Sequence, residues 1–316
     1  MRILSRLVLL LGVSLACYSP ASAKAQAIDI KQQWIVGKHY EYTAQMGQES
    51  SFAIGPQKVE QKTDMTMDMG LTVQPHEDGQ QKRLIMKYGR VAMDMTMNGQ
   101  KMSYDSANPD AGTDPMGIGK RMGAIVGKEV KMLANKNDEV TEIENYDDFI
   151  KSIPATPGMD PSKMFSKESL QQMMKQGTLQ ALPGHPVSPG DSWPFTRDIV
   201  MPQVGKVTVK GTYTYQGMED HGGFSCAKIA TDGTLTMDFN GGGDASSPLN
   251  GLGMKVTECS LKGTIWFDLS LGTTRDGSFD QEIKMSMKNP ADPSATIEIP
   301  MKQKVSVVLS KVEDVK

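Results

Sequence analysis

A long run of alternating residues between Lys58 and Gln74 is the feature that most limits how this chain can fold. Apolar residues dominate the odd-numbered positions, among them Met65, Met67 and Met69, whereas charged residues and threonine dominate the even-numbered positions. Successive side chains of a β-strand point to opposite faces, so the run predicts a strand with one buried and one solvated face. At about 3.3 Å per residue it would extend about 50 Å, which is long for a strand and typical of a large curved sheet.

The same alternation recurs along most of the chain. After Lys82 the apolar positions change from even to odd numbers at Gly89, beyond which Met93, Met95 and Met97 share one face. One extra residue would restore the facing, so we predict a β-bulge at Gly89. Further alternating segments cover residues 207–215, 227–239, 259–269, 279–287 and 297–309. The predicted fold is mainly β, a large curved antiparallel sheet resembling half a barrel.

The middle of the chain departs from this pattern. Asp160 followed by proline predicts a helix start, and the apolar residues up to Gln176, including Met173 and Met174, continue the helix. A shorter helix is expected from Asp114, and a helical turn from Asn145. The sequence therefore predicts one or two helices between two β-rich stretches.

The two β-rich stretches show a weak internal similarity. Residues 70–95 and 211–239 each contain an acidic, histidine-bearing turn and end on apolar-Asp-apolar. We expect residues 24–316 to form a single β-rich domain, with similar halves at 28–145 and 183–316 joined by a helical segment at 146–182.

The first residues carry an export signal. Arg2 and Arg6 precede an apolar run, and small residues follow up to Ala23. This layout is typical of a secretory signal peptide, so we expect residues 1–23 to be removed and the protein to be periplasmic or secreted. Cys17 supports a less favoured alternative, a lipoprotein anchored through that cysteine.

Two cysteines, Cys226 and Cys259, remain after removal of the signal. Thiols pair by default in an oxidising compartment, so we predict a disulfide between them. Two buried free thiols are the alternative, because Cys226 lies on the polar side of its strand's alternation.

The composition argues against several functions. The net charge of -3 disfavours nucleic acid as a partner. None of the four histidines forms a His-Glu-x-x-His motif, and the chain has no Gly-x-Ser-x-Gly. We therefore expect no enzymatic activity, no cofactor and no histidine- or carboxylate-based metal site.

Methionine is the compositional anomaly, because the 24 methionines outnumber the 8 Phe, 8 Tyr and 3 Trp together. Closely spaced thioethers bind Cu(I), flexible methionines line adaptable apolar grooves, and methionine also serves as ordinary core. Their position on the apolar face favours groove or core over copper. The candidate ligand-binding residues are Met65, Met67, Met69, Met93, Met95, Met97, Met173 and Met174.

Four short motifs resemble those of an uncharacterised family of exported bacterial proteins, a domain of unknown function. They are residues 37–42, 104–106, 186–193 and 263–268. The layout is also similar to the half-barrel lipoprotein carriers of the bacterial envelope, whose curved sheet holds acyl chains under a helical lid. That resemblance implies a lipid or another apolar ligand on a concave face.

The preferred hypothesis is an exported, non-enzymatic envelope protein that binds an apolar ligand or lipid on a Met-rich concave face. One alternative is a structural or interaction module with a filled core and an envelope protein as partner. The other is a periplasmic Cu(I)-binding protein that uses its Met-x-Met strands.

Overall fold

The computed structural model describes residues 27–54, 57–115, 117–154, 161–168, 170–171, 181–201, 205–238, 253–289 and 292–315. The predicted signal peptide, Cys17, Met173 and Met174 lie outside the described residues. Residues 28–145 contribute six strands and residues 183–316 six more. The strands are β1 (Lys38–Ile54), β2 (Gln57–Pro75), β3 (Lys82–Met97), β4 (Gln100–Asp105), β5 (Glu129–Ala134), β6 (Val140–Ile143), β7 (Ser192–Met201), β8 (Gly205–His221), β9 (Phe224–Asp238), β10 (Lys255–Asp268), β11 (Thr273–Asn289) and β12 (Asp292–Asp314).

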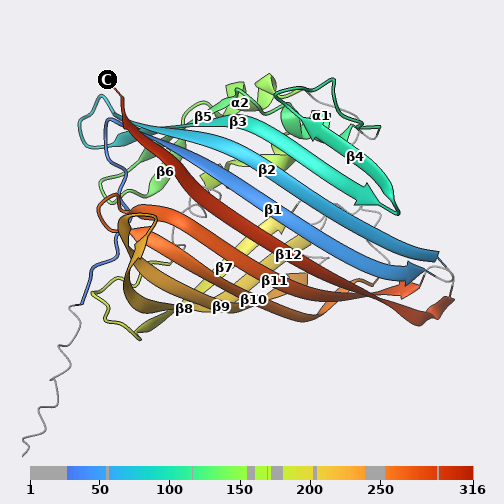
Figure 1. Ribbon diagram of the computed structural model, residues 1–316. Helices are drawn as coiled ribbons and strands as arrows, with labels where there is room; N and C mark the ends of the chain where they lie inside the picture. The colour runs from blue at the N-terminus through green and yellow to red at the C-terminus, as the bar shows by residue number, and fades with distance from the viewer. Residues whose placement is uncertain are drawn as a thin grey trace, which may run out of the picture.

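All twelve strands form one antiparallel sheet in the order β6-β5-β3-β2-β1-β12-β11-β10-β9-β8-β7, with β4 paired to β3. The first and last long strands meet in its middle, where Lys38 pairs with Asp314 and Ser50 with Met301. The edge strands β6 and β7 are not paired with each other, so the sheet is open, and it curves strongly across its width (Figure 1). The predicted curved, half-barrel-like antiparallel sheet is confirmed.

The bulge predicted at Gly89 is also confirmed. Met67 pairs with Val91 and Met69 with Tyr88, so that two residues of β3 stand opposite the single residue Asp68. A Cβ added to Gly89 would lie 3.1 Å from the Asp68 carbonyl oxygen, so a side chain here would crowd the partner strand. The bulge keeps the apolar residues on both sides of it on one face.

Three short helices lie between or beside the strands: α1 (Ile118–Gly123), α2 (Tyr146–Ser152) and α3 (Pro161–Met164). The helix expected from Asp114 begins four residues later, at Ile118. The Asp114 carboxylate accepts hydrogen bonds of 2.9 Å from the backbone amides of Ile118 and Lys120 in its first turn. The helix predicted from Asp160 begins at Pro161. It is not continuous as predicted, because α3 ends at Met164 and the chain is non-helical at Phe165 and Ser166 before helical residues resume at 167. The last predicted residues, 172–176, lie outside the described part of the chain.

Two apolar clusters cover opposite flanks of one face of the sheet. The first packs α2, through Phe149, against β2, β3 and β5, with Val73 and Leu84 fully buried. The second packs the segment around Ile30 against β7–β10, with Ile229 fully buried. The ladders across the sheet place both clusters on the same side, which we call the inner face; the opposite side is the outer face.

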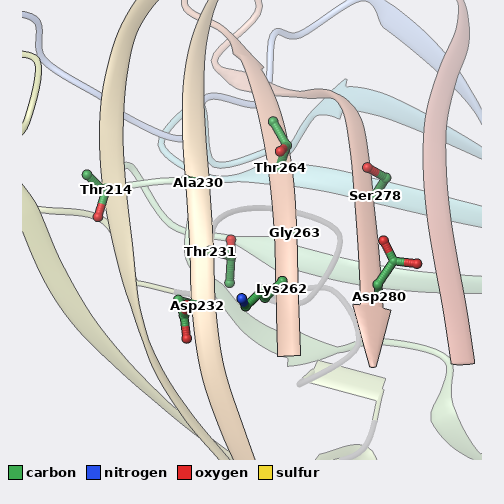
Figure 2. Close-up of a pocket in the computed structure, with 9 residues that line it drawn as sticks. All are labelled: Thr214, Ala230, Thr231, Asp232, Lys262, Gly263, Thr264, Ser278 and Asp280. Carbon is green, nitrogen blue, oxygen red and sulfur yellow. The ribbon is translucent and has the colours of Figure 1, made fainter. Parts of the chain in front are cut away.

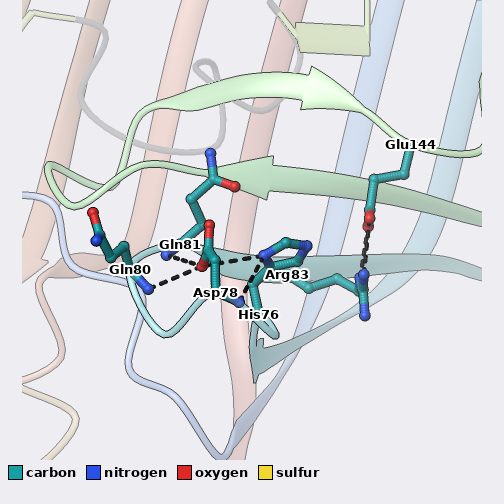
Figure 3. A network of polar contacts seen from close by, with 6 residues as sticks. All are labelled: His76, Asp78, Gln80, Gln81, Arg83 and Glu144. Atoms are coloured by element: carbon teal, nitrogen blue, oxygen red, sulfur yellow. Dashed lines mark hydrogen bonds and ion pairs between the residues drawn. The ribbon is translucent and has the colours of Figure 1, made fainter.

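A polar network closes the β2–β3 turn beside the first cluster (Figure 3). The Asp78 carboxylate accepts hydrogen bonds of 2.9 Å from the amides of Gln80 and Gln81 and lies 3.1 Å from His76 Nδ1. Arg83 forms a two-point ion pair with Glu144, at 2.6 and 2.9 Å, and so ties β3 to the segment that leads into α2. The Arg83–Glu144 pair therefore links β3 to the residue two positions before α2.

None of the helices within the described residues is both long enough and apolar enough to cross a membrane.

Candidate ligand-binding face

Between the two clusters, the inner face of the middle strands carries two rows of apolar side chains that are only partly buried. In the first row, strand pairing aligns Met65, Met46, Val305 and Phe279 on β2, β1, β12 and β11. In the second row, two residues further along each strand, it aligns Met67, Ala44 and Val307 on β2, β1 and β12. Each of these residues is partly exposed, in contrast to the fully buried residues of the flanks. We call these seven residues the open rows. They form an accessible apolar surface in the middle of the sheet.

The structure separates the candidate methionines into two groups. Met93 and Met95 are buried with Met102, and Ile118 and Met122 of α1 pack on them together with Met97. They fill a small core of their own under α1. By contrast, Met65 and Met67 belong to the open rows, and Met67 and Met69 also border the first cluster. The strand pattern could not distinguish the groups, because it does not show which strand α1 covers.

A band of amides borders the open rows. Gln48, Gln303 and Gln281 are paired in sequence across β1, β12 and β11 on the inner face, and all three are partly exposed. Amide groups both donate and accept hydrogen bonds, so this band offers polar contacts at one end of an apolar surface. The sequence analysis did not identify these residues. A glutamine at a position where the alternation places an apolar residue would have indicated an inward-facing polar group.

The outer face has a depression of about 390 Å³ over β8–β11 (Figure 2). Hydroxyl groups and charges line it, among them Thr264, Ser278 and Lys262. The remaining lining residues are Thr214, Ala230, Thr231, Asp232, Gly263 and Asp280. No aromatic or long apolar side chain is among them, so the depression suits polar groups and not an apolar ligand.

One group of side chains on the described residues has the composition of a cation site. Atoms of His39, Glu41 and Glu313 lie within 4.8 Å of one another, and Thr72 Oγ1 lies 2.8 Å from His39 Nδ1. However, the Lys311 ammonium already lies 2.7 Å from Glu313 and 3.8 Å from Glu41. A hydrogen bond from Lys311 lowers the pKa of the Glu313 carboxyl. The lysine thus supplies the positive charge that a metal ion would bring.

The predicted disulfide is wrong, because Cys226 and Cys259 are both free. Cys226 pairs with Asp268 at one end of the β9–β10 ladder, whereas Cys259 contacts the backbone of Leu235. Positions 226 and 235 are separated by about 30 Å along an extended strand, far beyond disulfide reach. Burial raises the pKa of both thiols. The alternation pattern shows which face of the sheet a residue lies on, but not which residue of the neighbouring strand it lies opposite. It therefore could not exclude a disulfide between these two cysteines.

Comparison with known proteins gives one family and several distant structural likenesses. The model of a family of unknown function, DUF6263, matches residues 79–274. No curated protein matches the chain significantly. One likeness is to lipovitellin, in a structure that describes its lipid–protein interactions, with 10% sequence identity and a TM-score of 0.47. The matched region covers 90% of this chain and 26% of the lipovitellin chain.

Two other solved structures have lower scores. DynF from the dynemicin biosynthesis pathway of Micromonospora chersina is 7% identical with a TM-score of 0.23, covering 93% of this chain and 88% of its own. A putative outer membrane lipoprotein-sorting protein domain from Vibrio parahaemolyticus is 9% identical with a TM-score of 0.15, covering 86% and 85%. The chain spans about a quarter of the lipovitellin chain. At these values the likenesses carry no functional argument.

Proposed function

This chain belongs to the DUF6263 family, whose function is unknown, and we propose that it is an exported, non-enzymatic envelope protein that binds an apolar ligand such as a lipid. The observation that carries the proposal is the set of open rows on the inner face. The flanks of that face, and the far end of β11 and β12 at Met287, Ile297 and Ile299, are closed by packed side chains. The open rows between them hold apolar groups within reach of solvent.

The chemistry of the open rows suits a flexible apolar ligand. Burying their exposed area would contribute roughly 25 cal/mol for each Å² removed from water. Methionine adapts its three side-chain torsions to a ligand of variable shape, and Phe279 adds a large flat surface. The glutamine band offers amide groups to any polar end of the ligand.

A titration with N-phenyl-1-naphthylamine, an uncharged probe that fluoresces in apolar surroundings, tests the proposal. Met65→Lys places a charge in the open rows, whereas Thr66→Lys places the same charge on the next residue, which faces outward. We expect the first variant to weaken probe binding at least about tenfold and the second to leave it within twofold. Equal binding by both variants, or no binding by the unmodified protein, would contradict the proposal. Circular dichroism checks that both variants fold.

A second function, Cu(I) binding, is favoured by one specific observation. Register places Met93, Met65 and Met46 side by side on β3, β2 and β1, so that three thioethers share one row. Thioethers are soft ligands suited to Cu(I). The double change Met46→Leu and Met65→Leu removes sulfur while roughly conserving volume. It would abolish Cu(I) uptake measured by mass spectrometry if copper is the ligand, and would leave probe binding nearly unchanged if an apolar molecule is.

Export is tested on the unmodified chain expressed in bacteria. We expect the mature protein in the periplasm with its first residue at Lys24. Retention in the membrane fraction that is abolished by Cys17→Ser would instead establish a lipid-anchored form.

A further inference from the structure

Arg197 places a cation on the inner face without an anionic partner among the described residues. It lies on edge strand β7, pairs with Val209, and shares its facing with the buried residues Trp193 and Phe195. Its Nε atom is buried and has no hydrogen-bond partner in the described part of the chain. No carboxylate within the described ranges forms an ion pair with it.

The guanidinium is nevertheless charged at neutral pH. Burial lowers the pKa of Arg197 to about 10, and Tyr213 offsets this effect only in part. The side chain as a whole is partly exposed, and the buried polar atom is Nε. Polar atoms removed from water are ordinarily hydrogen-bonded, because leaving them without a partner is costly. The free donor is therefore a local cost to the fold that an anionic ligand would relieve.

The surroundings of Arg197 are apolar and aromatic. Phe195 and Tyr213 stack with ring centroids 4.4 Å apart, and Trp193 lies 5.8 Å from Tyr213. Thr231, which pairs with Tyr213, has a buried hydroxyl that also lacks a partner among the described residues. Two polar groups without partners among the described residues thus lie on the same flank of the sheet.

The position of Arg197 in the sheet sets the length of the expected ligand. The row that contains Arg197 and Val209 lies beyond the end of the β9–β10 ladder, which stops at Gly233 and Leu261. Five strand spacings of about 4.8 Å separate β7 from β12 along the curved sheet. A ligand that reaches from Arg197 to the open rows must therefore be long. The apolar side chains of the second cluster and of the open rows favour a mostly apolar chain.

We propose that Arg197 binds the anionic head group, a carboxylate or a phosphate, of a long-chain amphiphile whose chain lies across the open rows. The planar guanidinium matches either group with two parallel hydrogen bonds. This inference rests on the proposed function and names its ligand class. It makes Arg197 the residue that selects a charged amphiphile over an uncharged one.

Calorimetric titration of the purified mature protein with oleate, oleyl alcohol and inorganic phosphate tests the proposal. Oleate and oleyl alcohol have the same chain and differ at the head group. The variants are Arg197→Met, which removes the charge and conserves apolar bulk, and Arg197→Lys, which keeps the charge without the planar fork. Lys210→Met is the matched control, because Lys210 is exposed on the outer face of the neighbouring strand.

We expect oleate to bind at least about tenfold more tightly than oleyl alcohol, and Arg197→Met to remove this difference without weakening oleyl alcohol. Arg197→Lys should retain part of the preference, and Lys210→Met all of it. Equal binding of the two ligands in the unmodified protein would overturn the role of Arg197 and leave the proposed function standing. Failure of both ligands to bind would refute the proposed function itself. Phosphate binding as tight as that of oleate would show a site for a free anion and overturn the amphiphile.

Discussion

Replacing Asp268 should strongly destabilise the sheet, because this carboxylate joins the β10–β11 turn to the largely buried guanidinium of Arg275. Asp268 is 3% exposed. Its Oδ1 accepts hydrogen bonds from the Ser270 amide at 2.9 Å, the Ser270 hydroxyl at 2.6 Å and the Leu271 amide at 3.2 Å. Its Oδ2 accepts two from Arg275, at 3.0 and 2.6 Å, and Arg275 stacks 3.4 Å above the Phe224 ring.

Asp268→Ala leaves the Arg275 charge, whose side chain is 13% exposed, without its partner. Breaking a buried ion pair in this way costs about 3–5 kcal/mol, and each lost hydrogen bond from a neutral donor to the charged carboxylate costs about 1.5–3 kcal/mol. The double variant Asp268→Ala with Arg275→Met should lose less than the sum of the two single changes, by about 1–3 kcal/mol. Urea unfolding followed by far-UV circular dichroism gives the free energies. A loss below about 1 kcal/mol for Asp268→Ala would refute the reasoning, because that is the range of an exposed pair.

The same group predicts a pH dependence. Burial acts to raise the pKa of Asp268, but the hydrogen bonds from Ser270, Arg275 and Leu271 outweigh it, so the pKa lies below its ordinary value. The carboxylate therefore stabilises the fold above the unfolded-state pKa of about 3.9, and this contribution is lost as the pH falls through the lower native value. The difference in unfolding free energy between the unmodified protein and Asp268→Ala should stay constant from about pH 7 to about pH 5, because the carboxyl is ionised in both the folded and the unfolded state there. It should shrink in stronger acid.

Three further predictions follow from the geometry. Both Cys226 and Cys259 should react with a thiol reagent after the protein is denatured without reductant, and reductant should not shift the midpoint of thermal unfolding. A protein mass two hydrogens lighter than that of the free-thiol form would contradict this prediction. Hydrogen bonds from Arg90 lower the pKa of Asp105 to about 2, so NMR titration should show this carboxylate ionised until the pH falls toward that value, and Arg90→Gln should move its titration upward. Gly263→Ala should cost about 1–3 kcal/mol, because the new methyl group would meet the Phe279 ring and lie 2.7 Å from the Ser278 carbonyl oxygen. Gly277→Ala, whose nearest neighbour would be 3.5 Å away, is the matched control and should cost less in thermal unfolding.

The features predicted correctly from sequence are those that depend on neighbouring residues. The alternation from Lys58 to Gln74 gave β2 to within a residue at each end, and the change of parity at Gly89 gave the bulge. Both are local, because facing is determined by a period of two along one strand. Asp114 likewise indicated a nearby helix, through the hydrogen bonds that its side chain accepts.

Features that depend on which strands pair could not be predicted in this way. Cys226 and Cys259 were predicted to pair because thiols pair by default in an oxidising compartment, and nothing in either strand gives the register that separates them. Met93 and Met65 look alike in sequence, yet α1 packs on β3, the strand of Met93, and on its neighbour β4. The inward facing of Arg197 could be detected from sequence, because it alternates in step with the apolar residues Trp193 and Phe195 of β7. That no partner for its Nε lies nearby among the described residues depends on the tertiary structure, which the sequence pattern does not show.

The open rows lie where the ends of the chain meet, and this location links binding to folding. The β1–β12 ladder pairs residues as far apart as Lys38 and Asp314, so closing it carries the largest loop-closure cost of any ladder in the sheet. Met46 on β1 and Val305 on β12 face each other across that ladder in the open rows. A ligand on these rows contacts both strands, and a ligand that binds only the native state stabilises it by mass action. The proposed ligand binding and the joining of the two halves of the sheet therefore depend on the same pair of strands.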